Sequence, residues 1–445
     1  MTSVLWFRRD LRISDHPALA AAAAEGEVVG LFVVDPRLWA SSARRAWVAA
    51  NVRALAEATG GALVLRYGDP ATVVPEVARS AGASTVHVTG ETTPYGRSRD
   101  ARVAERVRLL ETGTPYVVEP GLVRTRQGGP YQVFTPFARA WRSEATQAPF
   151  PAPEVTWRRM RNDARATAAL DEAIRHAPAG MPEPGEAAAL ARWRAFRPSL
   201  SSYAETRDLP ADDATSRLSP YLKVGAIHPR TLLASTTEGA EKFVTELAWR
   251  EFYADVLWHH PESAWSDLRP LHLPYDDPGD AVDAWREGRT GFPLVDAGMR
   301  QLAAEGWMHN RVRMIAASFL TKDLHAWWPV GARHFLELLV DGDLASNNHG
   351  WQWVAGTGTD AAPYFRIFNP VTQGKRFDPD GDYVRRWVPE LAHLPGRAAH
   401  EPWKHERGYD GGYPRPVVDH DEERGIALDR FSRRRSPGPA PPGRR

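Results

Sequence analysis

Four short apolar runs, rich in β-branched residues, lie within the first 90 residues and restrict the possible folds more than any other feature. They cover residues 3–7, 28–34, 62–67 and 84–89, and the helix-like stretches Pro17–Ala24, Ala43–Thr59 and Ala71–Ser80 separate them. Strands that alternate with helices predict a parallel sheet covered by helices. We therefore expect an α/β domain over residues 1–130. No GxGxxG follows the first run, so the usual dinucleotide-binding fingerprint is absent.

The pattern becomes helical after about residue 190. Long amphipathic stretches occur at Ala240–His259 and Val295–Leu324, and few strand-like runs accompany them. These stretches predict an all-α second domain over residues 196–430. Residues 131–195 are rich in Ala, Pro and charge, which predicts an interdomain connector with some helix. The Pro/Arg-rich residues 431–445 predict a disordered tail.

The composition excludes several classes of protein. With no cysteine among 445 residues, the chain has no disulfide framework, thiol nucleophile or zinc-thiolate site. No apolar run is long enough to cross a membrane, and the charged N-terminus lacks the apolar core of a signal peptide, so we expect a cytoplasmic protein. The net charge is only +1, so a nucleic-acid-binding surface would have to be a local patch.

The stretch Asp341–Pro379 has no clean helical or strand period, and we expect it to be mostly ordered loop. Long irregular segments inside compact proteins are uncommon and are usually functional. Polar residues beside Trp351 and Trp353 suggest a ligand with a flat aromatic face and hydrogen-bonding edges. A nucleotide-type cofactor or a flipped nucleobase fits that description.

Asp341 and Asp343 begin this stretch as an Asp-Gly-Asp sequence. Two acids are costly to bury without partners. Calcium is one conceivable partner, but the rest of the calcium-loop pattern is missing, so we expect no metal.

The segment TELAWREFYADV places an acid, an indole, a guanidinium and a phenol on one helical face. These residues are Glu246, Trp249, Arg250 and Tyr253, spaced i, i+3, i+4 and i+7. Spacing alone allows two interpretations. One is a buried ion pair with aromatic packing, and the other is the wall of a pocket for a planar polar ligand.

The segment GWMHNRVRM places Trp307, Asn310 and Arg313 close to one helical face. On its own this signal is weak, because Asn310 and Arg311 are equally compatible with solvated helix positions.

The segment TSRLSPYLKVG combines two hydroxyl groups, an arginine and a turn at an expected helix start. Hydroxyls and free N–H groups at a helix N-terminus can form an anion site, but they also serve as a simple N-cap. Both interpretations stay open on the residues alone.

These motifs together resemble the signature of the DNA photolyase/cryptochrome family. The resemblance also includes VLWFRRDLRISDHPAL near the N-terminus, and it extends from about residue 3 to about residue 430 in the family's order. It implies a Rossmann-like parallel-sheet domain followed by an all-α FAD-binding domain. It further implies FAD as cofactor and damaged DNA as partner, and we expect a monomer without a membrane segment.

The resemblance assigns the FAD site residue by residue. It implies that Tyr203 and the stretch Thr215–Ser219 hold the diphosphate, and that Asn347 lies at flavin N5. The full set of cofactor residues that it implies is Tyr203, Thr215, Ser216, Arg217, Leu218, Ser219, Arg313, Asp341, Gly342, Asp343 and Asn347.

The same resemblance assigns the lesion site. It implies that Glu246 hydrogen-bonds the damaged bases and that Trp249 stacks on them. Further lesion or DNA contacts that it implies are Arg207, Arg250, Asn310, Arg311, Met314, Trp353 and Gln373. The family's (6-4) branch carries His in place of Asn310 and in place of Met314, so the residues match the cyclobutane-dimer branch. This branch uses excited, reduced FAD to split the dimer and is a carbon–carbon lyase.

Family members relay electrons to oxidised flavin through three tryptophans. Trp351 and Trp328 match the inner and middle positions, whereas the outer position is Tyr275. A tyrosine must usually lose a proton when it is oxidised, so photoreduction through it is expected to be slower. Trp265 and Trp327 are alternative exits.

The segment TGETTPYGRSRD resembles the antenna loop of deazaflavin-binding family members, because the folate-binding type has an acid in place of Gly96. It implies 8-hydroxy-5-deazaflavin bound near Glu91 and Arg44. Methenyltetrahydrofolate, or an ordinary loop with no pigment, is the alternative.

Two other functions compete with dimer repair. A cryptochrome-like photoreceptor would bind FAD without repairing DNA, but this chain retains the lesion-facing residues and has a tail of only about 15 residues. A nucleotide transferase would need a P-loop, which the chain lacks.

Overall fold

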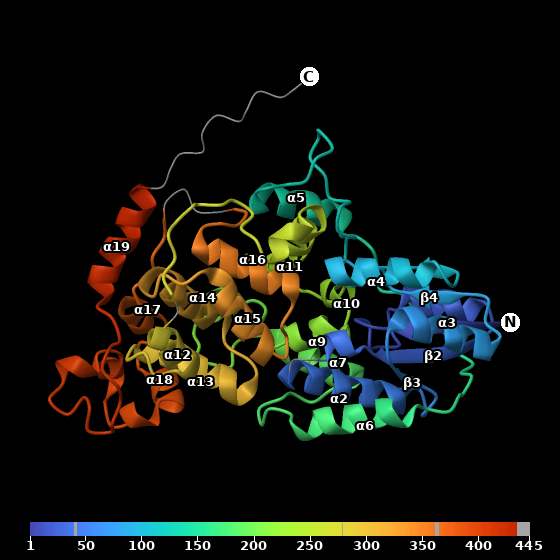
Figure 1. Cartoon of the computed structure of the whole chain (residues 1–445), viewed down its shortest axis with the longest axis horizontal. Helices are drawn as coiled ribbons and strands as arrows, with labels where there is room; N and C mark the ends of the chain where they lie inside the picture. Colours follow the sequence, from blue (N-terminus) through green and yellow to red (C-terminus); the bar gives the residue numbers. More distant parts are fainter. Residues whose placement is uncertain (40–41, 278, 361–364, 434–445) are drawn as a thin grey trace.

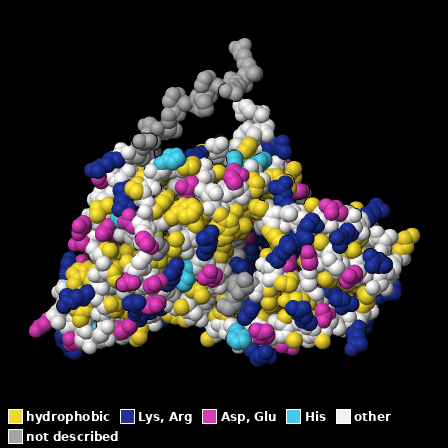
Figure 2. Space-filling model, viewed as in Figure 1, with side chains coloured by type: hydrophobic (Ala, Val, Ile, Leu, Met, Phe, Trp, Pro, Cys, Tyr) yellow, Lys and Arg dark blue, Asp and Glu magenta, His cyan; other side chains and the backbone are white. Residues whose placement is uncertain are grey.

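The computed structural model describes residues 1–39, 42–277, 279–360 and 365–433. Figure 1 shows two lobes, an α/β lobe formed by the N-terminal third and a helical lobe formed by the rest. On the face drawn in Figure 2, the surface is hollowed where the two lobes meet. The prediction of an α/β domain followed by an all-α domain is confirmed. Within the described ranges, no helix is both long and apolar enough to cross a membrane.

The first lobe is built on a parallel sheet with strand order β3-β2-β1-β4-β5. The strands are β1 (Thr2–Phe7), β2 (Glu27–Val34), β3 (Val64–Tyr67), β4 (Val86–Val88) and β5 (Leu109–Glu111). The first four match the predicted runs. We missed β5 because this short strand is only partly buried and has no apolar run to reveal it.

Four helices alternate with the strands: α1 (Pro17–Ala24), α2 (Ser42–Ala58), α3 (Pro70–Ala81) and α4 (Pro94–Ala104). Three of them begin with proline, which lacks the N–H that a first helical residue cannot use. The side chain of Asp69 caps α3 and that of Thr93 caps α4. Polar residues before a proline therefore set where these helices begin.

The expected connector contains three helices, α5 (Phe134–Glu144), α6 (Ala164–Arg175) and α7 (Glu186–Phe196). In Figure 1, α6 runs beside α2 in the first lobe, whereas α5 lies beside α11 (Glu241–His259) in the second. The connector thus packs against both lobes and is not an extended linker.

The second lobe is helical. Besides α11 it contains α8 (Tyr203–Thr206), α9 (Ser219–Val224), α10 (Pro229–Leu233), α12 (Gly279–Glu287), α13 (Pro293–Glu305), α14 (Asn310–Ser318), α15 (Trp328–Leu338), α16 (Leu344–Ala355), α17 (Pro370–Phe377), α18 (Asp382–Trp387) and α19 (His420–Ser432). Since α19 extends to Ser432, residues 431 and 432 are helical, although we predicted that the tail begins at 431. Residues 434–445 of that tail lie outside the described residues.

Two predictions about this lobe were wrong. The stretch Asp341–Pro379 is not mostly loop, because α16 and α17 lie within it. The side chain of Asp343 accepts from Ser346 N at 3.1 Å to start α16, and Gly356 ends it at a φ of +90°. Helix α16 was hidden because buried residues surround it on several sides, so it shows no single apolar face.

The stretch Val295–Leu324 is not one helix. Gly306 ends α13 in the left-handed conformation, and His309 then caps α14 through its side chain. After α14 the chain makes a π-helical turn at Phe319–Asp323.

The two lobes meet where the loop after β1 lies against the end of α9. Leu11 N donates to Val224 O at 3.0 Å, and Arg12 Nη1 donates to Gly225 O at 3.0 Å. A Cβ on Gly225 would lie 2.0 Å from Arg9 O, so only glycine allows this approach. The contact brings the residues after β1 beside the helical lobe.

Candidate cofactor and substrate pocket

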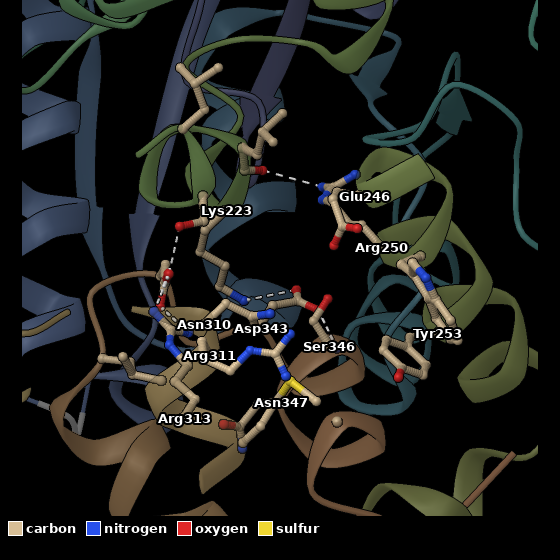
Figure 3. A pocket seen from close by; sticks show the side chains of 18 of the residues that line it. Lys223, Glu246, Arg250, Tyr253, Asn310, Arg311, Arg313, Asp343, Ser346 and Asn347 are labelled. Carbon is tan, nitrogen blue, oxygen red and sulfur yellow. Dashed lines mark hydrogen bonds and ion pairs between the residues drawn. The ribbon is translucent and has the colours of Figure 1, made fainter. Parts of the chain in front are cut away.

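A cavity of about 480 Å³ lies inside the helical lobe, which is a size typical of small-molecule sites. It joins most of the residues predicted from separate motifs. Those that line it are Tyr203, Arg207, Ser216, Leu218, Ser219, Glu246, Trp249, Arg250, Asn310, Arg311, Arg313, Met314, Asp341, Gly342, Asp343, Asn347, Trp351 and Trp353. Figure 3 shows side chains from several helices converging on this space.

The cavity lining carries more positive than negative charge. Its cationic side chains are Arg207, Lys223, Lys242, Arg250, Arg311 and Arg313, and its carboxylates are Glu246, Asp341 and Asp343. Six cations against three anions leave an excess of three positive charges. Such a surface attracts an anionic ligand, although the whole chain is nearly neutral.

Asp341 is held by two partners on the cavity wall. Ser219 Oγ donates to its Oδ2 at 2.6 Å, and the Arg313 guanidinium binds both carboxylate oxygens at 3.2 and 2.8 Å. A two-pronged arginine–carboxylate pair is strong and directional. The buried Asp341 carboxylate thus has a cationic partner in Arg313.

Asp343 has different partners, which we did not predict. Arg9 Nη2 donates to its Oδ2 at 2.8 Å and Lys223 Nζ at 3.4 Å. Burial opposes the charge of Asp343, but Lys223 and Arg9 outweigh it and hold the pKa of this carboxyl well below its usual range. Burial lowers the pKa of Lys223 to about 8.

A sequence signal for Lys223 exists, because it lies four residues after Ser219 and so on the same helical face. For Arg9 there is none, since it comes from the other lobe and is 334 residues away from Asp343 in the chain.

Asn347 presents one defined edge to the cavity. Its amide nitrogen donates to Ala332 O at 3.1 Å and to Asn348 Oδ1 at 2.8 Å. Both N–H groups are thereby engaged, which leaves the Oδ1 atom as the polar group available to a ligand. The arrangement offers an acceptor and not a donor.

Helix α11 forms the opposite wall, and the single face predicted from its spacing lines the cavity. Glu246 pairs with Arg207 and, at 3.1 Å, with Lys242. Trp249 stacks on Phe134 of α5 with ring centroids 3.6 Å apart and planes 6° from parallel. The connector therefore fixes the orientation of this indole.

Two of the predicted DNA-contacting arginines are engaged within the protein. Arg250 donates to Pro115 O at 3.1 Å and to Leu222 O at 3.3 Å. Arg311 binds Asp208 at 2.8 Å and lies over the ring of Phe377. Both still line the cavity, so their charges act on whatever enters it.

Several predicted site residues lie away from the lining. These are Thr215, Arg217, Gln373, Trp328, Tyr275, Arg44 and Glu91. Arg217 stacks over Trp307 at 4.1 Å and pairs with Asp213 and Glu305, so its guanidinium is directed to protein partners.

Four aromatic residues on or near α15 range from the cavity lining to the surface and are called the aromatic row: Trp351, Trp328, Trp327 and Tyr275. Trp351 lines the cavity and packs so closely on α15 that a Cβ at Gly331 would lie 2.2 Å from its ring. Trp328 begins the same helix and is fully buried. Its ring centroid is 6.4 Å from that of Trp327, which is in turn 6.4 Å from Tyr275. Trp327 and Tyr275 are 37% and 39% exposed.

The predicted antenna residues lie near the junction of the lobes. Glu91 accepts from the backbone N–H groups of Thr92 and Thr93, and its side chain covers the face of Gly96. Burial opposes its charge, but neighbouring arginines lower the pKa of Glu91 to about 2. Arg44 instead donates to Leu336 O of α15 at 2.9 Å.

Known protein families and relatives match most of the chain. The family model described as "FAD binding domain of DNA photolyase" matches residues 243–433, and that described as "DNA photolyase" matches residues 3–154. The chain is 42% identical to the deoxyribodipyrimidine photo-lyase of Streptomyces griseus, with 97% of this chain and 99% of that protein covered. It is 46% identical to an enzyme of the same name from Thermus thermophilus, with 87% and 92% covered.

Solved structures give the same result. A class III photolyase from Agrobacterium tumefaciens superposes with a TM-score of 0.88 at 34% identity and covers 97% of each chain. A cryptochrome from Synechocystis superposes with a TM-score of 0.87 at 27% identity, covering 96% of this chain and 98% of that one. Sequence, fold and pocket together establish that the chain belongs to the DNA photolyase/cryptochrome family.

Proposed function

We propose that this protein is a light-driven lyase that repairs cyclobutane pyrimidine dimers in DNA with FAD as its cofactor. The observation that carries the proposal is that one cavity has two chemically different walls. One wall presents Asp343 and Asn347, suited to the polar edge of a flavin. The other presents Glu246 and Trp249, suited to a flipped-out pyrimidine dimer.

The charges of the lining fit FAD. A diphosphate and an anionic reduced flavin together carry about three negative charges, which match the excess of three positive charges on the wall. We propose that Tyr203, Ser216 and Ser219, which line the cavity, hold the diphosphate, and that the Oδ1 of Asn347 accepts from a flavin N–H. When bound and reduced, FAD absorbs blue or near-UV light and supplies the electron that splits the dimer and returns afterwards.

The α11 wall supports recognition of a flipped dimer. Trp249 offers a flat apolar face, and Met314 and Trp353 line the same cavity. Glu246 offers a carboxylate to the polar edges of the bases. Flipping costs a few kcal/mol and is cheapest for damaged bases, which already stack badly.

Two arginines of the cavity lining, Arg207 and Arg311, support binding of the DNA backbone. Asn310 and Gln373 are the further proposed contacts. Arginine contacts to phosphate give affinity without sequence preference, as repair of a lesion at any position requires.

The aromatic row supports delivery of electrons to oxidised flavin. We assign Trp351 as the inner residue and Trp328 as the middle one, with Trp327 and Tyr275 at the solvent end. Each step passes one electron inward, and a thiol in solution refills the outermost ring. Repair by an already reduced enzyme does not need this row.

For the antenna we propose 8-hydroxy-5-deazaflavin near Glu91 and Arg44. The support is the TTPYGRSRD loop and a carboxylate that stays ionised at neutral pH. A near-UV absorption band beyond that of flavin, retained after purification and lost in Glu91→Ala, is the expected signature.

One experiment tests the central proposal. The chemically reduced protein is illuminated with an oligonucleotide that contains a single thymine dimer, and recovery of the ultraviolet absorbance of the bases is followed. Repair in the light, with none in the dark, is expected. A protein that binds FAD but leaves the dimer intact would be a photoreceptor, which would overturn the assignment. Sedimentation of the same sample tests the proposed monomer.

A further inference from the structure

Arg9 is the one side chain of the β1–α1 loop that pairs with a carboxylate of the cavity in the helical lobe, among the pairs seen in the described residues. Backbone hydrogen bonds hold the loop there. The loop lies so close to Gly225 that a side chain at position 225 would clash with the carbonyl oxygen of Arg9. The Arg9 side chain is only 16% exposed. It is therefore a buried cation supplied by one lobe to the other.

The guanidinium of Arg9 lies between two carboxylates. Nη2 donates to Asp343 Oδ2 at 2.8 Å, and Nη1 lies 3.7 Å from Glu91 Oε1. Burial opposes its charge, but Tyr116, Asp343 and Glu91 together raise the pKa of Arg9 above its ordinary value. Since arginine does not lose its proton in proteins, this charge is permanent.

Arg9 also has hydrogen-bond donors that are not used. Its Nε and Nη1 atoms are buried and have no hydrogen-bond partner among the described residues. A buried guanidinium with two unused donors is costly, so neighbouring charge and not hydrogen-bond count accounts for its position.

Asp343, the partner of Arg9, controls the geometry of the pocket. Its side chain caps α16, the helix that carries Asn347 and Trp351. It also lines the cavity itself, so an uncompensated charge on it would act on any ligand there. Lys223 Nζ also offsets the charge of Asp343, from 3.4 Å, but Arg9 Nη2 is closer, at 2.8 Å.

We propose that Arg9 is a positioning residue through which the N-terminal lobe sets the redox balance of the cofactor, by holding Asp343 and cancelling its charge. The inference rests on the proposed FAD site. An added electron makes the flavin more negative, so a bare carboxylate at the cavity would disfavour the reduced form. Arg9 removes that penalty and thereby favours the state that repair requires.

The test measures the flavin redox potential in a double-mutant cycle that removes the charges of Arg9 and Asp343 singly and together, here called the charge cycle. In Arg9→Gln the ratio of reduced to oxidised flavin at a fixed potential falls about tenfold, or about 30 mV for a two-electron couple. Asp343→Asn shifts it in the opposite direction. The double variant Arg9→Gln/Asp343→Asn returns to within about threefold of wild type. Arg9→Lys, which keeps the charge, restores most of the loss.

The matched control is Arg8→Gln. Arg8 is the preceding residue, is similarly buried, and pairs with Asp100 inside its own lobe at 2.7 Å. This variant is expected to lower thermal stability without moving the potential. An equal shift in Arg8→Gln, or an Arg9→Gln shift that persists unchanged in the Asp343→Asn background, would overturn the proposal.

These potentials are measured without DNA or light. A wild-type protein that fails to repair dimers would therefore contradict the proposed function, while the charge cycle would still decide the role of Arg9.

Discussion

The indole nitrogen of Trp328 and the Oδ1 atom of Asp267 are 2.7 Å apart, in the middle of the aromatic row. The indole nitrogen of Trp327 lies 3.4 Å from the same oxygen. A carboxylate shared by two indoles stabilises the positive charge that electron loss leaves on either ring. Water adds further stabilisation only at Trp327, which is exposed, so the positive charge is drawn outward.

Substitutions along this row are expected to separate photoreduction from repair. Trp351→Phe and Trp328→Phe slow photoreduction of oxidised FAD on the order of tenfold or more, because each removes a ring that can be oxidised. Flash absorption spectroscopy measures this rate. Repair by chemically reduced enzyme stays at the wild-type level, and a parallel loss of repair would contradict the assignment.

The exit of the row is tested by comparing Trp327→Phe with Tyr275→Phe. Because Trp327 touches Trp328 and shares Asp267 with it, we expect Trp327→Phe to cause the larger loss. The transient radical then has a tryptophan spectrum in the wild type and in Tyr275→Phe. A tyrosine radical that survives in Trp327→Phe at full yield would assign the exit to Tyr275.

Gly331→Ala is expected to disturb the cavity by displacing the ring of Trp351, which lines it. The new Cβ would lie 2.2 Å from the Trp351 ring and 2.5 Å from Leu320, so the ring must move. We expect a loss of about 1–3 kcal/mol in the free energy of unfolding, together with slower photoreduction.

The control for this prediction is Gly425→Ala in α19, where no atom lies within 4 Å of the added Cβ. This change is expected to stabilise the protein by about 0.5–1 kcal/mol. Urea denaturation measures both variants, and an unperturbed Gly331→Ala would refute the packing argument.

Phe134→Leu is expected to weaken binding of dimer-containing DNA. The stacked partner holds the Trp249 ring in place, and such pairs contribute about 0.5–1.5 kcal/mol, or roughly twofold to tenfold in affinity. Phe137→Leu is the matched control, since Phe137 lies in the same helix but packs on Phe252. Fluorescence anisotropy with damaged and undamaged DNA should show the loss for the damaged DNA in Phe134→Leu alone.

FAD affinity is expected to fall as the pH rises through about 8. Burial lowers the pKa of Lys223 to about 8, so this side chain is charged below that pH and neutral above it. Its charged neighbours do not titrate in this range, because the pKa of Asp343 lies well below it and the arginines Arg9 and Arg44 keep their protons. Loss of one cation from the lining weakens binding of an anionic cofactor about threefold to tenfold between roughly pH 7 and 9.5. In Lys223→Arg the dependence of FAD affinity on pH should vanish, because arginine stays charged. Equilibrium dialysis measures the affinity of both proteins.

A structural feature could be predicted from the sequence when the residues that form it lie close together in the chain. The α11 face was predictable because Glu246, Trp249, Arg250 and Tyr253 are related by helical spacing alone. The pair between Arg9 and Asp343 was not, since only the docking of the two lobes brings these residues together. Helix α16 escaped detection for a related reason, because its polar face is turned towards a ligand cavity and not towards solvent.

The packing of Glu91 over Gly96 also limits how this loop can evolve. A Cβ at position 96 would lie 1.9 Å from Glu91 Cγ, so no other residue fits while Glu91 keeps its place. An acid at position 96 therefore cannot arise by one substitution; Glu91 must be shortened first or at the same time. The order of substitutions is therefore constrained, because position 96 accepts a side chain only once the side chain of position 91 has changed.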